Sequence, residues 1–75
     1  MPLDKDRNRT LVALRDAPQG MHTRDLATAL SLPPDVVERH LQYCADYDLV
    51  TWKKKDGGLA AVTDRGRDYL TRQSL

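Results

Sequence analysis

The fold of this chain is decided by residues 23–50, which read TRDLATALSLPPDVVERHLQYCADYDLV. The pattern predicts a short helix, a turn with two prolines, and a longer amphipathic helix that ends before an apolar pair. In the longer helix, Val37, Leu41 and Cys44 have the spacing of a buried stripe. A helix-turn-helix followed by a strand presents one helix to the outside while the rest holds it in place. We therefore expect the site to be a surface and not a cleft.

The residues before this stretch predict one more helix. Asp4 can cap its first turn, and the helix continues to Arg15. It ends at residues 17–20, because proline cannot continue the helical hydrogen bonds and glycine suits the turn that follows. Met21 and His22 are expected to be extended. The next helix then begins within the decisive stretch itself.

Within that stretch, Thr23 is predicted to be the N-cap of the second helix, residues 24–30. Leu26, Ala29 and Leu30 are expected to face inward, since they are one helical turn apart. Proline suits the first position of the third helix, about residues 34–47, because its missing N–H loses nothing there.

The residues after this stretch predict a β-hairpin and a last helix. The strands span residues 49–55 and 59–62, and residues 56–58 tolerate the positive φ angles of a tight turn. Thr63 caps a last helix that runs to about residue 73. The chain is therefore expected to be mainly α-helical with a small β-hairpin.

Length and cysteine content restrict the possible functions. A chain of 75 residues is one domain, and it buries only about 60% of the surface of its unfolded form, so a deep catalytic cavity is not expected. The single Cys44 provides neither a disulfide framework nor a structural zinc site. No apolar run could span a membrane and no signal-peptide core is evident, so we expect a cytoplasmic protein without membrane association. No cofactor is implied.

Charge distribution is more informative than net charge. The net charge of +1 is low for a protein that neutralises phosphates. Residues 31–50 carry Arg39 against four acidic residues, a local charge of −3. Lys53, Lys54 and Lys55 concentrate positive charge on the predicted hairpin.

The order of three helices, a two-stranded wing and a fourth helix resembles the winged helix-turn-helix domains of small bacterial, archaeal and phage transcription regulators. The resemblance covers nearly the whole chain. Its most specific pieces are LSLPP at residues 30–34 followed by Val37 and Leu41, Leu49 and Val50 opening the wing, and VTDRGR at residues 62–67. In the last piece, a threonine caps the helix and a glycine allows close packing. The resemblance implies an α+β fold, with a three-helix core, a wing and a C-terminal helix, in a single domain of residues 1–75.

Three residues depart from the family pattern. Ser31 stands where glycine is usual, which predicts mild backbone strain. Pro33 stands where a serine or threonine often caps the third helix, and proline has no side-chain oxygen for that purpose. Asp48 replaces a helix-terminating glycine, although aspartate tolerates the left-handed conformation better than most residues.

In DNA-binding members of the family, the third helix enters the major groove. The corresponding outward positions of this chain are Asp35, Val36, Glu38, Arg39 and Gln42. Arg39 can bind guanine through two hydrogen bonds, Gln42 can pair with adenine, and an acidic side chain can accept from cytosine. However, acidic residues in a first turn also simply favour the positive end of the helix dipole, and they repel phosphates.

The wing, about residues 49–62, offers phosphate contacts. On a continuous strand, Lys53 and Lys55 would share one face and Lys54 the other with Trp52. Alternatively, the lysines only protect an edge strand from aggregation. Trp52 is expected to be a half-buried core anchor under the last helix, or else an exposed contact for a protein partner. Five arginines are either further phosphate contacts or solvated surface: Arg7, Arg9, Arg24, Arg65 and Arg67.

His40 and Cys44 lie one helical turn apart, within reach of each other as base and nucleophile or as metal ligands. Cys44 belongs to the apolar stripe and no third polar partner is evident, so we expect neither an enzyme nor a metal site.

The sequence therefore predicts a regulator that binds double-stranded DNA. A homodimer is expected if the domain works without other domains, because one small module contacts too few base pairs for useful specificity. The alternative is a protein-interaction module that docks a partner through the acidic third helix or Trp52, since fold does not fix function.

Overall fold

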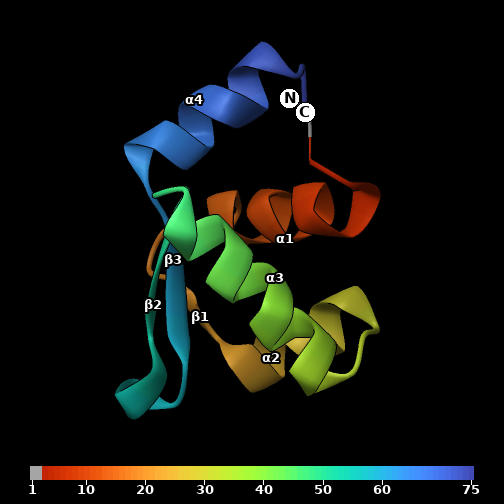
Figure 1. The fold of residues 1–75 in the computed structure, drawn as a ribbon, viewed down its shortest axis with the longest axis vertical. Helices are drawn as coiled ribbons and strands as arrows, with labels where there is room; N and C mark the ends of the chain where they lie inside the picture. The colour runs from red at the N-terminus through yellow and green to blue at the C-terminus, as the bar shows by residue number, and fades with distance from the viewer. Residues whose placement is uncertain (1–2) are drawn as a thin grey trace.

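The computed structural model describes residues 3–75, so the first two residues of the predicted domain lie outside it. In chain order the elements are α1 (Lys5–Arg15), β1 (Met21–His22), α2 (Thr23–Leu30), α3 (Pro34–Asp46), β2 (Val50–Lys53), the 3₁₀ turn η1 (Lys54–Asp56), β3 (Leu59–Val62) and α4 (Asp64–Arg72). The strands form one antiparallel sheet in the order β1-β3-β2. Figure 1 shows α2 and the β2–β3 turn at one end of the molecule and α4 at the other. The predicted fold class is confirmed.

The ends of two helices are capped as the sequence predicts. The Asp4 carboxylate accepts a 2.9 Å hydrogen bond from the Arg7 backbone N–H at the start of α1. The Thr63 hydroxyl accepts a 3.0 Å hydrogen bond from the Gly66 N–H at the start of α4. At the start of α3, Pro33 provides no side-chain cap. These local signals therefore set the boundaries of α1 and α4.

The core is formed by all four helices together with β2 and β3. Val37, Leu41 and Cys44 are fully buried, which confirms the predicted stripe of α3. On α2 the prediction is wrong at Ala29, which is exposed, whereas Ala27 is buried. The reason is that α2 packs against both α1 and α3, and its buried face extends from the two leucines toward Ala27. Alanines flank the leucines on both sides, and their small size gives no signal of which side is covered.

Thr23 is not the N-cap of α2, contrary to the prediction. The helix begins at Thr23, and His22 stands in the N-cap position without a side-chain hydrogen bond. The Thr23 hydroxyl is occupied by Gly58 and Trp52. This arises because β1 pairs with β3 and leads directly into α2 beside the β2–β3 turn. The structure thus adds a third strand to the predicted two-stranded hairpin.

The departures from the family pattern appear in the backbone. Ser31 adopts the left-handed conformation at φ 56° after α2, and Asp48 does so at φ 60° after α3. A side chain in this region carries steric strain, so the strain predicted for Ser31 is present. Gly57 and Gly58 have φ values of 69° and 70°, which confirms the turn chemistry of the hairpin.

Both described ends of the chain are hydrogen bonded near α4. The Leu3 N–H donates to the Tyr69 hydroxyl at 2.8 Å. The Leu75 N–H donates to the Leu70 carbonyl at 2.9 Å, and its own carbonyl accepts from Arg15 Nη1 at 2.6 Å. The two ends therefore lie at the end of the molecule opposite the β2–β3 turn (Figure 1).

Candidate nucleic-acid interface

The outward face of α3 carries most of the side chains predicted to read DNA. Its buried stripe anchors the helix against α1, α2 and β2, which fixes the rotation of its outer face. Four of the predicted positions are exposed and Val36 is half-buried; the exposed ones are Asp35, Glu38, Arg39 and Gln42. The N-terminal half of α3 lies at the same end of the molecule as α2 and the β2–β3 turn (Figure 1).

Arg39 and Gln42 differ in how free their side chains are. Within residues 3–75, Arg39 forms no ion pair, so its guanidinium is available to an external acceptor. Gln42 Nε2 donates to Asp46 Oδ1 at 2.9 Å. Gln42 must therefore exchange this bond before its amide can donate to a base.

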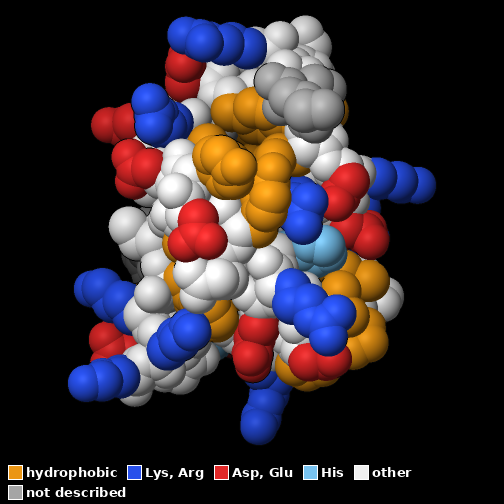
Figure 2. Space-filling view, in the orientation of Figure 1, with side chains coloured by type: hydrophobic (Ala, Val, Ile, Leu, Met, Phe, Trp, Pro, Cys, Tyr) orange, Lys and Arg blue, Asp and Glu red, His pale blue; other side chains and the backbone are white. Residues whose placement is uncertain are grey.

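The wing lysines are all exposed, but their arrangement differs from the prediction. Strand β2 ends at Lys53, and Lys54 and Lys55 belong to η1. The expectation that Lys53 and Lys55 share a strand face is therefore wrong, because Lys55 has left the strand. Lys54 has also left the strand, so it does not share a strand face with Trp52, but its Nζ lies 4.8 Å from the centroid of the Trp52 ring. Figure 2 shows basic side chains around this end of the molecule, interleaved with acidic ones.

Trp52 is half-buried and packs against the core. Its indole N–H donates to the Thr23 hydroxyl at 3.1 Å, so the side chain is fixed to the start of α2 instead of lying under α4 as predicted. The core-anchor interpretation fits this geometry. An exposed contact for a protein partner does not, because the indole N–H already has an acceptor.

The five arginines fall into two groups. Arg7 pairs with Asp4 and lies 3.8 Å from the centroid of the Tyr43 ring. Arg9 pairs with Asp6 and donates to a backbone carbonyl, and Arg67 pairs with Asp64. Arg24 and Arg65 are exposed and form no ion pair in the described part of the chain. Arg24, at the start of α2, is the one beside the wing.

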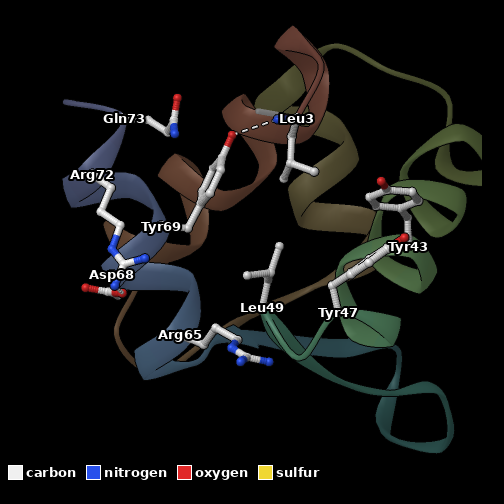
Figure 3. A pocket seen from close by; sticks show the side chains of 9 residues that line it. All are labelled: Leu3, Tyr43, Tyr47, Leu49, Arg65, Asp68, Tyr69, Arg72 and Gln73. Carbon is white, nitrogen blue, oxygen red and sulfur yellow. Dashed lines mark hydrogen bonds and ion pairs between the residues drawn. The ribbon is translucent and has the colours of Figure 1, made fainter. Parts of the chain in front are cut away.

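A separate groove lies at the opposite end, between the end of α3 and α4. It is open and has a volume of about 570 Å³. Figure 3 shows its lining: Leu3, Tyr43, Tyr47, Leu49, Arg65, Asp68, Tyr69, Arg72 and Gln73. Tyr47 is 58% exposed, and its ring centroid is 4.9 Å from that of Tyr43. The sequence did not predict this groove; the tyrosines were the only signal of it.

His40 and Cys44 do not form a reactive pair. Cys44 is fully buried, and among the described residues neither ring nitrogen of His40 has a hydrogen-bond partner. Burial raises the pKa of the Cys44 thiol to about 11, which opposes thiolate formation. Residues 3–75 contain no group of three His, Cys, Asp or Glu side chains that could hold a metal ion. No helix in this range is long and apolar enough to cross a membrane.

The buried thiol predicts a specific pH dependence of stability. The pKa of Cys44 is about 11 in the folded state against an ordinary value of 9.0, so the unfolded chain loses its proton first as pH rises. Stability from this group is therefore present below pH 9 and is lost between pH 9 and 11. At neutral pH, we expect Cys44→Ala to be about 1 kcal/mol or more less stable than wild type. At pH 10.5 the wild type should have lost about 2 kcal/mol relative to the variant, which is enough to cancel or reverse a difference of this size.

Urea denaturation of wild type and Cys44→Ala between pH 7 and pH 10.5 measures the difference. All other titrating groups are the same in both proteins, so their contributions to stability cancel in the comparison. A difference in stability that does not change with pH would show that the pKa of Cys44 is not raised by folding. Rapid alkylation of the folded protein near neutral pH would also contradict the raised pKa, because an inert buried thiol should react only on unfolding.

No protein-family model matches the sequence, and no curated protein matches it. Solved structures do. RV1404 from Mycobacterium tuberculosis is 27% identical, with a TM-score of 0.80, and the match covers 92% of this chain and 49% of that protein. A MarR family protein from the same organism is 26% identical, with a TM-score of 0.82 and coverage of 93% and 50%. A MarR family transcriptional regulator from Streptomyces coelicolor is 23% identical, with a TM-score of 0.89 and coverage of 96% and 52%. The chain thus spans about half the length of these proteins.

Proposed function

We propose that this chain, a winged helix-turn-helix domain, binds double-stranded DNA as a transcription regulator, with α3 in the major groove and the wing on the backbone. One observation carries the proposal. The N-terminal half of α3, with exposed Asp35, Glu38 and Arg39, and the lysine-bearing turn lie at the same end of a fold shared with MarR family regulators. A groove-reading helix beside a basic loop is the arrangement by which winged domains contact bases and phosphates together.

On α3, the basic and the acidic side chains are suited to different bases. Arg39 is exposed and unpaired within the described residues, so it can bind the O6 and N7 atoms of guanine. Asp35 and Glu38 can accept from cytosine amino groups, and their charge repels phosphates at any other position. The acidic face therefore lowers non-specific affinity and leaves phosphate binding to other elements.

The wing supplies that phosphate binding. Lys53 and Lys55 are exposed beside the turn, whereas the Lys54 ammonium lies over an indole ring. Arg24, exposed at the start of α2, adds a further cation at this end of the molecule. These side chains compensate for a nearly neutral chain by placing positive charge where the backbone of a duplex would pass.

The proposal includes a homodimer. A single 13-residue recognition helix reads only a few base pairs, and two half-sites related by a two-fold axis multiply specificity. Docking of a protein partner through Trp52 lacks such support, because Trp52 is half-buried and its indole N–H is already bonded. Docking through α3 is the other form of this alternative, and it would use the exposed Asp35 and Glu38.

Selection from a random-sequence DNA pool, at low and physiological salt, tests the proposal. The expected result is an enriched motif, of two-fold symmetry if the protein dimerises, that the wild type prefers over scrambled duplex. If no duplex is preferred at physiological salt, the proposal fails.

The wing lysines should set the salt dependence of binding. Replacing both Lys53 and Lys55 with alanine should weaken binding to all duplexes alike, and should reduce the log–log salt slope by about two, one for each lost phosphate contact. Fluorescence anisotropy titrations at several salt concentrations measure the slope. The double variant Lys5→Ala, Arg72→Ala is the control. It has the same change in net charge, and neither side chain lies in α2, α3 or the wing. Equal slopes for the two double variants would show that the wing does not touch the backbone.

A further inference from the structure

We propose that Thr23 is a positioning residue that locks the wing turn against the start of α2, and so holds the wing lysines at a fixed place relative to α3. The inference rests on the proposed function for its purpose, but the lock itself is a property of the free protein. It assigns a role to a side chain that the sequence suggested only as a helix cap.

Thr23 connects the helix-turn-helix to both sides of the wing turn. Its backbone N–H donates to the Gly58 carbonyl at 3.0 Å, and its hydroxyl donates to the same carbonyl at 2.8 Å. The hydroxyl also accepts from Trp52 Nε1 at 3.1 Å. Trp52 precedes the turn and Gly58 is its last residue, so one side chain fastens both ends of the turn to α2.

The packing around this contact leaves little freedom. Thr23 is 8% exposed, and Gly58 is buried. A Cβ atom at Gly58 would collide with the Thr23 hydroxyl, and one at Gly57 would lie 2.9 Å from His22 Cδ2. The two glycines thus allow the turn to approach the start of α2 closely, which is the approach that the hydroxyl needs for both hydrogen bonds.

The lock bears directly on the DNA-facing groups. Trp52 carries the Lys54 ammonium over its ring. Thr23, Trp52 and Lys54 also line a small hollow of about 280 Å³, together with Glu38 from α3. The lock therefore lies between the recognition helix and the wing. Val50, Ala60 and Val62 anchor the strands of the wing in the core, and β1 pairs with β3 through Met21 and His22. At the turn itself, the Thr23 hydroxyl supplies the hydrogen bonds to Gly58 and Trp52.

The hydroxyl is the group that matters, since it must donate and accept at once. Valine has nearly the same shape as threonine but can do neither. Thr23→Val therefore removes two hydrogen bonds and retains the backbone bond to Gly58. Thr23→Ser retains the hydroxyl and should behave as wild type. Trp52→Phe removes the indole donor together with one ring of the side chain, and keeps the Thr23 hydroxyl bond to Gly58.

The test compares wild type, Thr23→Val and Thr23→Ser. In Thr23→Val, hydrogen exchange of backbone amides 54–60 should accelerate about tenfold, while amides in α3 and α4 remain unchanged. Affinity for the selected duplex should fall about tenfold, because binding must now order a mobile wing. The control Thr71→Val also loses a threonine hydroxyl, but an exposed one in α4, which donates to the Arg67 carbonyl at 3.1 Å. It should change neither the exchange rates nor the DNA affinity.

Each outcome is decisive for one of the two proposals. Unchanged wing exchange in Thr23→Val overturns the lock, even if the DNA affinity falls. If amide exchange in the wing is faster in Thr23→Val and returns to the wild-type rate in Thr23→Ser, but DNA affinity is unchanged in Thr23→Val, the positioning role is also overturned. If the wild type prefers no duplex, the proposed function fails, and the exchange rates still decide whether the lock exists. Should Thr23→Val not fold, Trp52→Phe is measured in the same way, with the same expected direction.

Discussion

Gly66→Val is expected to remove a large part of the stability of the folded protein. Gly66 is buried in α4, where a Cβ atom would collide with the Leu49 carbonyl and lie 2.6 Å from Val62 Cγ2. The Leu49 carbonyl cannot move freely, since it accepts a 3.0 Å hydrogen bond from the Thr63 N–H. A larger side chain must separate α4 from the wing, at a cost of about 3 kcal/mol or more. A domain of this size has only about 4 to 11 kcal/mol of stability.

Circular dichroism and urea denaturation measure this loss, with Thr71→Val as the control for valine at an exposed position of the same helix. Gly66→Ala makes the test sharper. Helix propensity alone predicts that this change stabilises by about 1 kcal/mol, whereas the collision predicts destabilisation. A more stable alanine variant would show that α4 does not approach Leu49 this closely.

Arg39→Ala is expected to weaken binding to the selected duplex by about 1–3 kcal/mol and to relax the preference at one base pair. The folded protein should be unaffected, because the side chain is exposed and unpaired among residues 3–75. Titration of selected and scrambled duplexes at physiological salt measures both effects. Arg65→Ala is the matched control, since Arg65 is exposed on α4 at the other end of the molecule.

The protein-docking alternative predicts the opposite pattern. Arg39→Ala would then have no effect on DNA, and charge reversal at Asp35 and Glu38 would abolish capture of a partner. Equal losses for Arg39→Ala and Arg65→Ala would show that the effect is one of overall charge, and would remove α3 from the role of base reader.

Much of the fold could be predicted because its signals are local. Asp4 and Thr63 cap their helices through a side chain and an amide three residues away. The buried stripe of α3 follows from helical spacing, and the tight turn follows from the tolerance of its glycines for positive φ values. Each of these needs only a few neighbouring residues, which the sequence displays directly. The outward positions of α3 follow from the same spacing.

Most of the errors depend on contacts distant in sequence, whereas the error at Lys55 is local. Thr23 resembles a cap until β1 pairs with β3 and brings Gly58 to it, 35 residues away. Ala27 and Ala29 are equivalent until α1 and α3 determine which is covered. Lys55 leaves the strand because η1 begins one residue earlier, at Lys54. The exposure of Asp35, Glu38, Arg39 and Gln42 on α3 was therefore predicted correctly, whereas Val36 is half-buried and the geometry of the wing was predicted incorrectly.

The hydrogen bonds that hold Leu3 and Leu75 near α4 have a practical consequence for joining this domain to other chains. Both attachment points lie at the end away from the recognition helix and the wing (Figure 1). A flexible linker of about ten residues spans roughly 15–20 Å. Two copies fused head to tail through such a linker would keep both recognition faces open. The spacing of their half-sites on a duplex could then be selected by linker length alone, through effective concentration.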